Sequence, residues 1–352
     1  MLEWSKKKQG VLYMNKRLVV IVLAIALLVI SSFSQALAPK PDPSEQQNED
    51  YFGRKYVDQF LNTEKSYEEK VIENGDPMNR VMVIPIEGVI SSDDSGDYNH
   101  QRLLDAIDQV KTDDTIKAVL LKINTGGGAV YETAEFYDKL KAVKEERQIP
   151  IYASFGGVAA SGGYYMAMLA DKVFASNETT TGSIGVIMSG YNTQELMDKV
   201  GIKTQTIKSA DMKDIMSMTR EMTKEEKDVL QTYIDEAFNR FVNVVKQGRN
   251  MDEKKVRELA DGRIYSGIQA KENGLVDEIG YWEDSLTALN KEANLEGPQV
   301  FEVTGSEKMF DSFMPSFFGS QLDKDAGQVN ELLDRLERPE MSIEYRWEGG
   351  GY

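Results

Sequence analysis

The chain has 352 residues, one histidine, no cysteine and a formal net charge of −17. Without cysteine there are no disulfides, no thiol catalysis and no Cys-based zinc site, and a single histidine argues against His triads and multi-His metal sites. Residues 1–17 contain five basic side chains and one acidic one, which leaves −21 on the remainder and argues against nucleic-acid binding. We therefore expect no metal, no cofactor and no nucleic-acid partner.

Residues 18–38 form an uncharged, mainly apolar segment behind the basic stretch 1–17. About twenty helical residues rise roughly 30 Å, enough to span a bilayer core, and the basic flank favours a cytoplasmic N-terminus. We expect an uncleaved single-pass anchor in the cell membrane, with the rest of the chain on the extracytoplasmic side. Two alternatives stay open, because Ala36-Leu37-Ala38 fits a signal-peptide cleavage site and Met14 would make a normal start.

The polar, proline-containing stretch 39–79 predicts a stalk, with a short helix near 56–71. We expect a globular domain over 80–300 and an irregular tail over 301–352, whose phenylalanines suit partner binding or self-association. Within the domain, apolar strands alternate with helical patterns, which predicts an α/β fold of parallel βαβ units. The expected strands are 81–86, 116–123, 149–153 and 172–175, and the expected helices are 103–110, 131–146, a segment after Ser161, 223–248, 252–259 and 282–292.

A glycine-rich turn places Ser161 between the expected strand 149–153 and the helix that follows. Backbone N–H groups at a helix N-terminus favour negative charge, and the neighbouring glycines let a substrate backbone approach closely. This setting favours a serine nucleophile. Tight packing of the helix on the strand would explain the same residues.

A second glycine turn, Asn124-Thr125-Gly126-Gly127-Gly128, also follows a strand. The carboxyl ends of parallel strands meet at one edge of a sheet, so both turns are expected at the same edge. The N–H groups of Gly127 and Gly128 could then stabilise an oxyanion. A purely structural turn is the alternative, whereas a phosphate loop is disfavoured because no Gly-Lys-Ser/Thr follows.

A serine nucleophile needs a base. His100 falls in an expected polar loop, which is typical of a solvated histidine. A lysine base would require its pKa to fall from about 10.4 to roughly 7–8, at a cost of about 4 kcal/mol of desolvation, and therefore an apolar setting. Lys208 and Lys213 have hydrophobic neighbours, but spacing does not choose between them, and a surface lysine is the alternative for each.

Several motifs occur together in a fixed order. They are Asn124-Thr125-Gly126-Gly127-Gly128, Ala160-Ser161-Gly162-Gly163-Tyr164-Tyr165, Thr181-Gly182-Ser183-Ile184-Gly185-Val186, Lys208-Ser209-Ala210-Asp211-Met212-Lys213-Asp214, Arg220-Glu221-Met222-Thr223 and Asp261-Gly262-Arg263-Ile264-Tyr265-Ser266-Gly267. The series covers about residues 80–285 and closely resembles the bacterial protease IV (signal peptide peptidase A) family of Ser-Lys membrane peptidases. The chain carries one copy of the domain and so resembles the short, Gram-positive-type form rather than the doubled one.

The resemblance implies a ClpP/crotonase-like fold, with Ser161 as nucleophile and Lys213 as general base. It further implies that Ser183 orients the lysine and that the oxyanion hole comes from Gly162 and the glycines Gly126, Gly127 and Gly128. The family usually has Ser-Pro-Gly-Gly where this chain has Thr125-Gly126-Gly127-Gly128, and glycine at the Ala210 position. Loss of that proline would loosen the oxyanion loop, but neither change touches the expected Ser-Lys pair.

We expect, therefore, a membrane-anchored serine endopeptidase of the cytoplasmic membrane that degrades remnant signal peptides and similar unfolded peptides. The resemblance also implies a ring-shaped homo-oligomer in which the serine of one subunit meets the lysine of its neighbour. A crotonase-type acyl-CoA enzyme and a catalytically silent membrane scaffold are the alternatives. The export anchor and the acidic body disfavour the first, and the retention of both Ser161 and Lys213 disfavours the second.

Overall fold

The computed structural model describes residues 67–92, 97–305 and 344–346. The basic segment 1–17, the expected anchor 18–38, and most of the expected stalk and tail lie outside these ranges. Within them, no helix combines the length and the apolar character needed to cross a bilayer.

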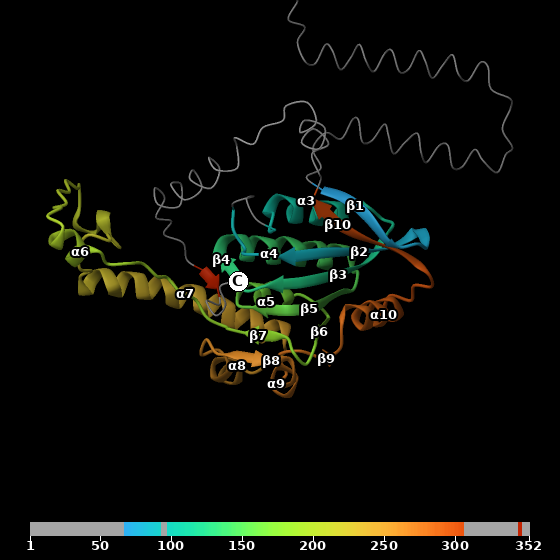
Figure 1. Cartoon of the computed structure of the whole chain (residues 1–352). Helices are drawn as coiled ribbons and strands as arrows, with labels where there is room; N and C mark the ends of the chain where they lie inside the picture. The colour runs from blue at the N-terminus through green and yellow to red at the C-terminus, as the bar shows by residue number, and fades with distance from the viewer. Residues whose placement is uncertain (1–66, 93–96, 306–343, 347–352) are drawn as a thin grey trace, which may run out of the picture. The chain divides into compact units, whose positions relative to one another are not determined.

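A mixed, mainly parallel β-sheet forms the centre of the domain (Figure 1). Its strands lie in the order β1-β10-β2-β3-β5-β6-β9, with β7 paired to β5 and β8 to β7. The pairs between β10 and β9 are parallel, as is β5 with β7, whereas β1 and β8 add in antiparallel fashion. The strands of this sheet are β1 (Tyr67–Glu73), β2 (Asp76–Glu87), β3 (Ile116–Thr125), β5 (Ile151–Ala160), β6 (Lys172–Ala175), β7 (Thr180–Gly182), β8 (Ile264–Ser266), β9 (Glu278–Ile279) and β10 (Pro298–Gly305). A separate antiparallel pair joins β4 (Gly127–Ala129) to β11 (Glu344–Arg346).

Both faces of the central sheet are covered. On β2, Met82 and Ile84 face the larger core, and Val81 and Val83 face a second core that helix α10 closes with Leu286 and Leu289. Burial on both faces explains why these strands read as continuous apolar runs in the sequence. The helices are α3 (His100–Thr112), α4 (Val130–Arg147), α5 (Gly162–Ala167), α6 (Gln194–Lys199), α7 (Lys224–Gly248), α8 (Glu253–Leu259), α9 (Gly267–Glu272) and α10 (Trp282–Glu292), with a 3₁₀ turn η1 at Asp211–Asp214.

Helix α7 is 25 residues long, and its two halves lie in different surroundings. Near its C-terminal end, Phe241, Val242 and Val245 are buried, and the Phe241 ring lies 5.1 Å from that of Tyr165 on α5. The N-terminal half leaves Val229 and Tyr233 about half exposed. Only the second half of α7 is therefore anchored in the core.

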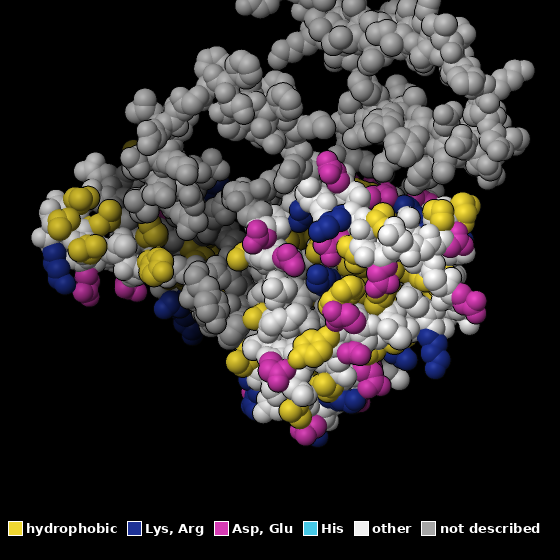
Figure 2. Space-filling model, turned by 45° about the vertical axis from the view of Figure 1, so that its right-hand side comes forward, with side chains coloured by type: hydrophobic (Ala, Val, Ile, Leu, Met, Phe, Trp, Pro, Cys, Tyr) yellow, Lys and Arg dark blue, Asp and Glu magenta, His cyan; other side chains and the backbone are white. Residues whose placement is uncertain are grey.

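Residues 185–225, which we call the arm, run from β7 along α7 and project beyond the sheet (Figure 1). None of these residues is buried, so the arm has no core of its own. Hydrophobic side chains gather on it (Figure 2), and the most exposed of them are Tyr191, Leu196, Val200 and Ile207. A surface of this kind is typical of a site that contacts another molecule.

The expected parallel βαβ units are confirmed, and the sheet extends past the expected domain limits. Strand β1 occupies residues 67–73, where we expected the end of a stalk helix, and β10 continues through Gly305. The two strands pair with each other, with Tyr67 opposite Gly305. Pairing between residues so distant in sequence leaves no local pattern, and the exposed charged residues of β1 gave this segment a polar sequence.

Candidate functional site

The turn after β5 holds Ser161 in an unusual backbone conformation. Its φ and ψ are 51° and −115°, in a region that serine seldom occupies. The Ser161 N–H donates to the Gly182 carbonyl at 2.8 Å, and the Ser161 carbonyl accepts from Tyr165 N–H at 2.9 Å. Only 1% of the residue is exposed. A serine fixed in this way between a strand and a helix has the arrangement found at nucleophile turns.

The second glycine turn lies directly beside Ser161. Thr125 at the end of β3 is paired with Ala159 on β5, and the Thr125 Cγ2 methyl would lie 2.7 Å from any Cβ at position 163. Glycine at 163 therefore lets α5 pack closely on β3. The sequence correctly placed both turns at one edge of the sheet.

The Thr125 hydroxyl fixes the shape of the second turn. It accepts a hydrogen bond from Gly127 N–H at 3.0 Å and donates one to the Gly88 carbonyl. Gly127 and Gly128 have φ values of 100° and 156°, which side chains rarely adopt. Because the Gly127 N–H is already engaged by Thr125, the remaining candidates for oxyanion donors among the four expected glycines are Gly126, Gly128 and Gly162.

The backbone of strand β4 is paired on both sides. On one side it is held by Ile90, whose N–H donates to the Gly127 carbonyl at 3.0 Å and whose carbonyl accepts from Ala129 N–H at 2.8 Å. A Cβ on Gly128 would lie 2.0 Å from the Ile90 carbonyl oxygen, so this contact requires glycine. The backbone of β11 pairs antiparallel along β4, with Tyr345 opposite Gly128.

Ser183 lies next to the nucleophile turn through β7. Ala160 pairs with Gly182, and Ser183, at φ 48°, donates its N–H to the Arg263 carbonyl at 2.8 Å. Ser183 is 7% exposed. The structure thus brings together Ser161, Ser183 and the expected oxyanion glycines.

Lys213 lies elsewhere. It is an exposed residue of η1 on the arm, and neighbouring Asp214 is linked through Arg220 to Glu226 at the start of α7. At about 1.5 Å per residue, Glu226 is roughly 22 Å along the helix from Phe241, which packs on α5 just behind Ser161. Within one chain, Lys213 is therefore far from Ser161 and lacks the apolar setting that a lysine base requires.

His100 is not a solvated loop residue, as the sequence suggested, but the first residue of α3. Its side chain is 13% exposed, with Nδ1 2.8 Å from the Tyr98 hydroxyl and Nε2 3.1 Å from Glu135 Oε2. The hydrogen bond from His100 lowers the pKa of the Glu135 carboxyl, with further help from Lys139. These partners give His100 a structural role at the start of α3.

Two residues of the site escaped sequence reasoning, namely Thr125 as the residue that fixes the glycine turn and Arg220 as a link between the arm and α7. The Arg220 motif was noticed in the sequence, but only side-chain geometry shows its partners.

Among the residues that the structure describes, no group of three or more His, Asp or Glu side chains is arranged to hold a metal ion.

Comparisons with known proteins match the chain to a peptidase family. The family model described as Peptidase family S49 matches residues 143–296. A protein of Enterococcus faecium named as a signal peptide peptidase SppA is 40% identical over 331 residues, which cover 92% of this chain and 94% of that protein. A Synechocystis protein named as a protease is 47% identical over 168 residues, or 48% of this chain and 60% of its own length. The chloroplastic serine protease SPPA of Arabidopsis thaliana is 30% identical over 196 residues, or 55% of this chain and 29% of its own length.

Proposed function

The chain belongs to peptidase family S49 and is a serine peptidase, and from this premise we propose that Ser161 is its nucleophile and Lys213 its general base. The observation that carries the proposal is the strained turn at Ser161, set beside the glycine turn 126–128 and the start of α5. Membership of a peptidase family sets aside both the acyl-CoA enzyme and the silent scaffold.

In the proposed reaction, the neutral amine of Lys213 takes the Ser161 hydroxyl proton as Oγ attacks the scissile carbonyl carbon. The N–H groups of Gly128 and Gly162 stabilise the negative charge on the carbonyl oxygen. Collapse of this intermediate breaks the C–N bond, and the lysine ammonium returns the proton to the leaving amine. Water then attacks the acyl-enzyme by the same route and frees Ser161. Ser183 would orient the lysine amine beside the serine.

We propose that the lysine reaches the serine from a neighbouring copy of the chain. The arm carries Lys213 away from its own Ser161, exposes apolar side chains and has no buried residue. Contact with a second copy would cover these side chains and give Lys213 the apolar setting that a lysine base needs. A closed ring satisfies every subunit equally, because each arm then serves the next subunit's serine.

The proposed substrates are extended peptides, including remnant signal peptides. The pairing of β11 with β4 supports this, because it shows that an extended segment fits antiparallel along Gly127–Ala129. Main-chain hydrogen bonds of this kind hold a peptide with little regard to its side chains. The apolar segment 18–38 would anchor the enzyme in the cytoplasmic membrane, with the peptidase domain on the extracytoplasmic side.

Active-site labelling tests the nucleophile. A serine-directed phosphonate reagent should add one equivalent per active serine, and peptide mapping should find the label on Ser161. The Ser161→Ala variant should take up none. A label on another serine, with Ser161 unmodified, would contradict the assignment.

A further inference from the structure

The arm places Lys213 without any help from a hydrophobic core. Neither α6 nor η1 has a buried residue, and the whole segment 185–225 lies at the surface. A general base must nevertheless be held within a fraction of an ångström of its working position, since a misplacement of about 1 Å can cost a hundredfold in rate. Within one chain, polar contacts therefore hold η1 in place.

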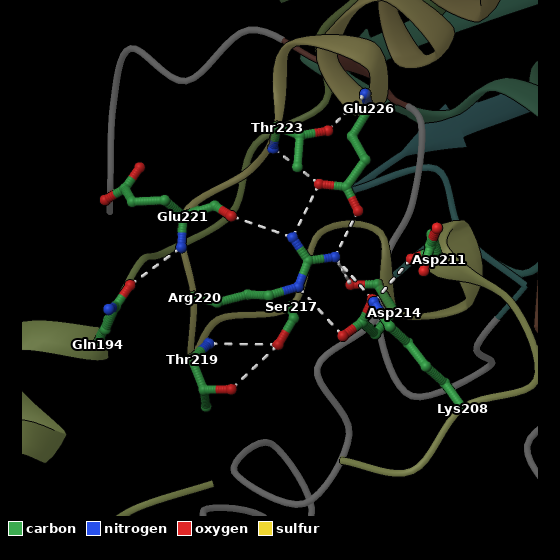
Figure 3. Close-up of polar contacts among 10 residues, drawn as sticks. All are labelled: Gln194, Lys208, Asp211, Asp214, Ser217, Thr219, Arg220, Glu221, Thr223 and Glu226. Atoms are coloured by element: carbon green, nitrogen blue, oxygen red, sulfur yellow. Dashed lines mark hydrogen bonds and ion pairs between the residues drawn. The ribbon is translucent and has the colours of Figure 1, made fainter. Parts of the chain in front are cut away.

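Arg220 supplies most of these contacts (Figure 3). Its Nη2 donates to Asp214 Oδ1 at 2.6 Å and to the Asp214 carbonyl at 3.1 Å, and its Nε donates to Asp214 Oδ2 at 3.1 Å. One guanidinium thus holds both the side chain and the backbone of the residue that follows Lys213. A planar guanidinium donates parallel hydrogen bonds in fixed directions and so fixes the orientation of the carboxylate, which a lysine ammonium does not do.

The same guanidinium is bound to the first turn of α7. Its Nη1 donates to Glu226 Oε2 at 2.8 Å, and its Nη2 contacts Glu226 Oε1. Glu226 is 2% exposed and also accepts from Thr223 N–H at 2.8 Å as part of the capping box. Since α7 packs against α5 through Phe241 and Tyr165, Arg220 connects η1 to the rigid body of the domain.

Charge balance around η1 depends on the same residue. Asp214 also accepts from Lys208 Nζ at 2.8 Å, and Lys208 in turn binds the Asp211 carbonyl. Hydrogen bonds from Arg220, then those from Lys208, hold the pKa of the Asp214 carboxyl well below its usual range. Besides Lys213 itself, the charged groups drawn around the turn are the cations Arg220 and Lys208 and the carboxylates of Asp211, Asp214, Glu221 and Glu226 (Figure 3).

We propose that Arg220 is the positioning residue for Lys213, fixing η1 on α7 and neutralising the carboxylates beside the base. This inference rests on the proposed function of Lys213. Loss of Arg220 would leave Asp214 with Lys208 alone and Glu226 without its cation. The added negative potential favours the ammonium form of a nearby lysine, so the base would become neutral only at higher pH.

The test uses the full-length, assembled protein with a fluorogenic peptide, and compares Arg220→Gln with Arg220→Lys. We expect Arg220→Gln to lower kcat by about tenfold to a hundredfold and to move the acid limb of the kcat/KM profile to higher pH. Arg220→Lys should move the acid limb of the kcat/KM profile back toward its wild-type pH, because it restores the positive charge. Its kcat should stay low, because lysine does not restore the paired hydrogen bonds of the guanidinium. Arg257→Gln is the matched control, since it removes an exposed pair with Glu253 on α8, and should leave both unchanged.

Oligomer mass, measured for every variant, separates positioning from assembly. Wild-type mass with the expected kinetic changes supports the inference. If Arg220→Gln leaves kcat and the acid limb of the kcat/KM profile unchanged, the inference is wrong. It is also wrong if dissociation of the oligomer fully accounts for the loss of activity. The Lys213→Ala variant keeps the two proposals apart: if it remains active, the proposed function fails, whereas if it is inactive and Arg220→Gln behaves as wild type, only the role of Arg220 is wrong.

Discussion

Replacement of Thr125 by valine tests the structure of the oxyanion turn. Valine has nearly the same shape and keeps the methyl that packs on Gly163, but it loses the hydroxyl that binds the Gly88 carbonyl and the Gly127 N–H. Thr125 is 3% exposed, so both partners would lose their hydrogen bond in a buried place. Each such group costs about 1–3 kcal/mol.

The flexible glycines allow the turn to shift and recover part of this cost, so we expect a loss of about 2 kcal/mol in unfolding free energy. For a domain of this size, that lowers Tm by about 4–8 °C. The shift would also move the Gly128 donor. Since complete loss of one oxyanion donor costs about 10²–10³ in kcat, we expect a fall of at least about tenfold, with KM little changed.

The assay measures kcat and KM on a fluorogenic peptide, together with Tm and oligomer mass. Thr125→Ser is the matched control, because it keeps the hydroxyl and removes the methyl, and it should retain most of the wild-type kcat. A Thr125→Val enzyme with wild-type kcat, assembled normally, would refute the view that this hydroxyl shapes the oxyanion turn.

Three further predictions follow from the site. His100→Gln should change kcat/KM little, because His100 binds Tyr98 and Glu135 at the start of α3, and a large loss would restore a histidine base to consideration. The kcat/KM of the wild-type enzyme should rise toward alkaline pH, since a lysine base acts only when neutral, whereas a limb near pH 4–5 would indicate a carboxylate. Hydrogen bonds from Arg220 lower the pKa of Glu226 from 4.5 to about 2, so this pair stabilises the fold above pH 4.5 and loses its effect as pH falls toward 2. The Tm difference between wild type and Arg220→Gln should narrow across that window, and a constant difference would contradict this reasoning.

Local patterns explain what the sequence predicted well. The run Val81–Ile86 and the alternation of strands with helices led directly to the parallel sheet, because burial on both faces requires continuous apolar strands. The turns at Ser161 and at 126–128 were also predictable, since glycines mark positions where chains approach closely or φ is positive. Residues that lie near one another in sequence carried this information.

Long-range contacts explain what the sequence missed. The pairing of β1 with β10 joins segments more than 200 residues apart, and five of the seven residues of β1 are exposed, so that it shows no alternating strand pattern. The Thr125 hydroxyl and the Arg220 guanidinium bind residues whose contact with them cannot be predicted from sequence spacing. The place of Lys213 on the exposed arm was also beyond reach, because it follows from the backbone path of residues 185–225 and not from a local pattern.

The sharing of the active site between two copies of the chain is the central claim, and co-assembly tests it most directly. Ser161→Ala and Lys213→Ala subunits, each inactive alone, are mixed under conditions that allow subunit exchange, and mixed assemblies are verified by differential tags. We expect part of the wild-type activity to return, because some interfaces then pair an intact Ser161 with an intact Lys213 from its neighbour. Mixed assemblies that form and stay inactive would show that the serine and its base belong to the same subunit.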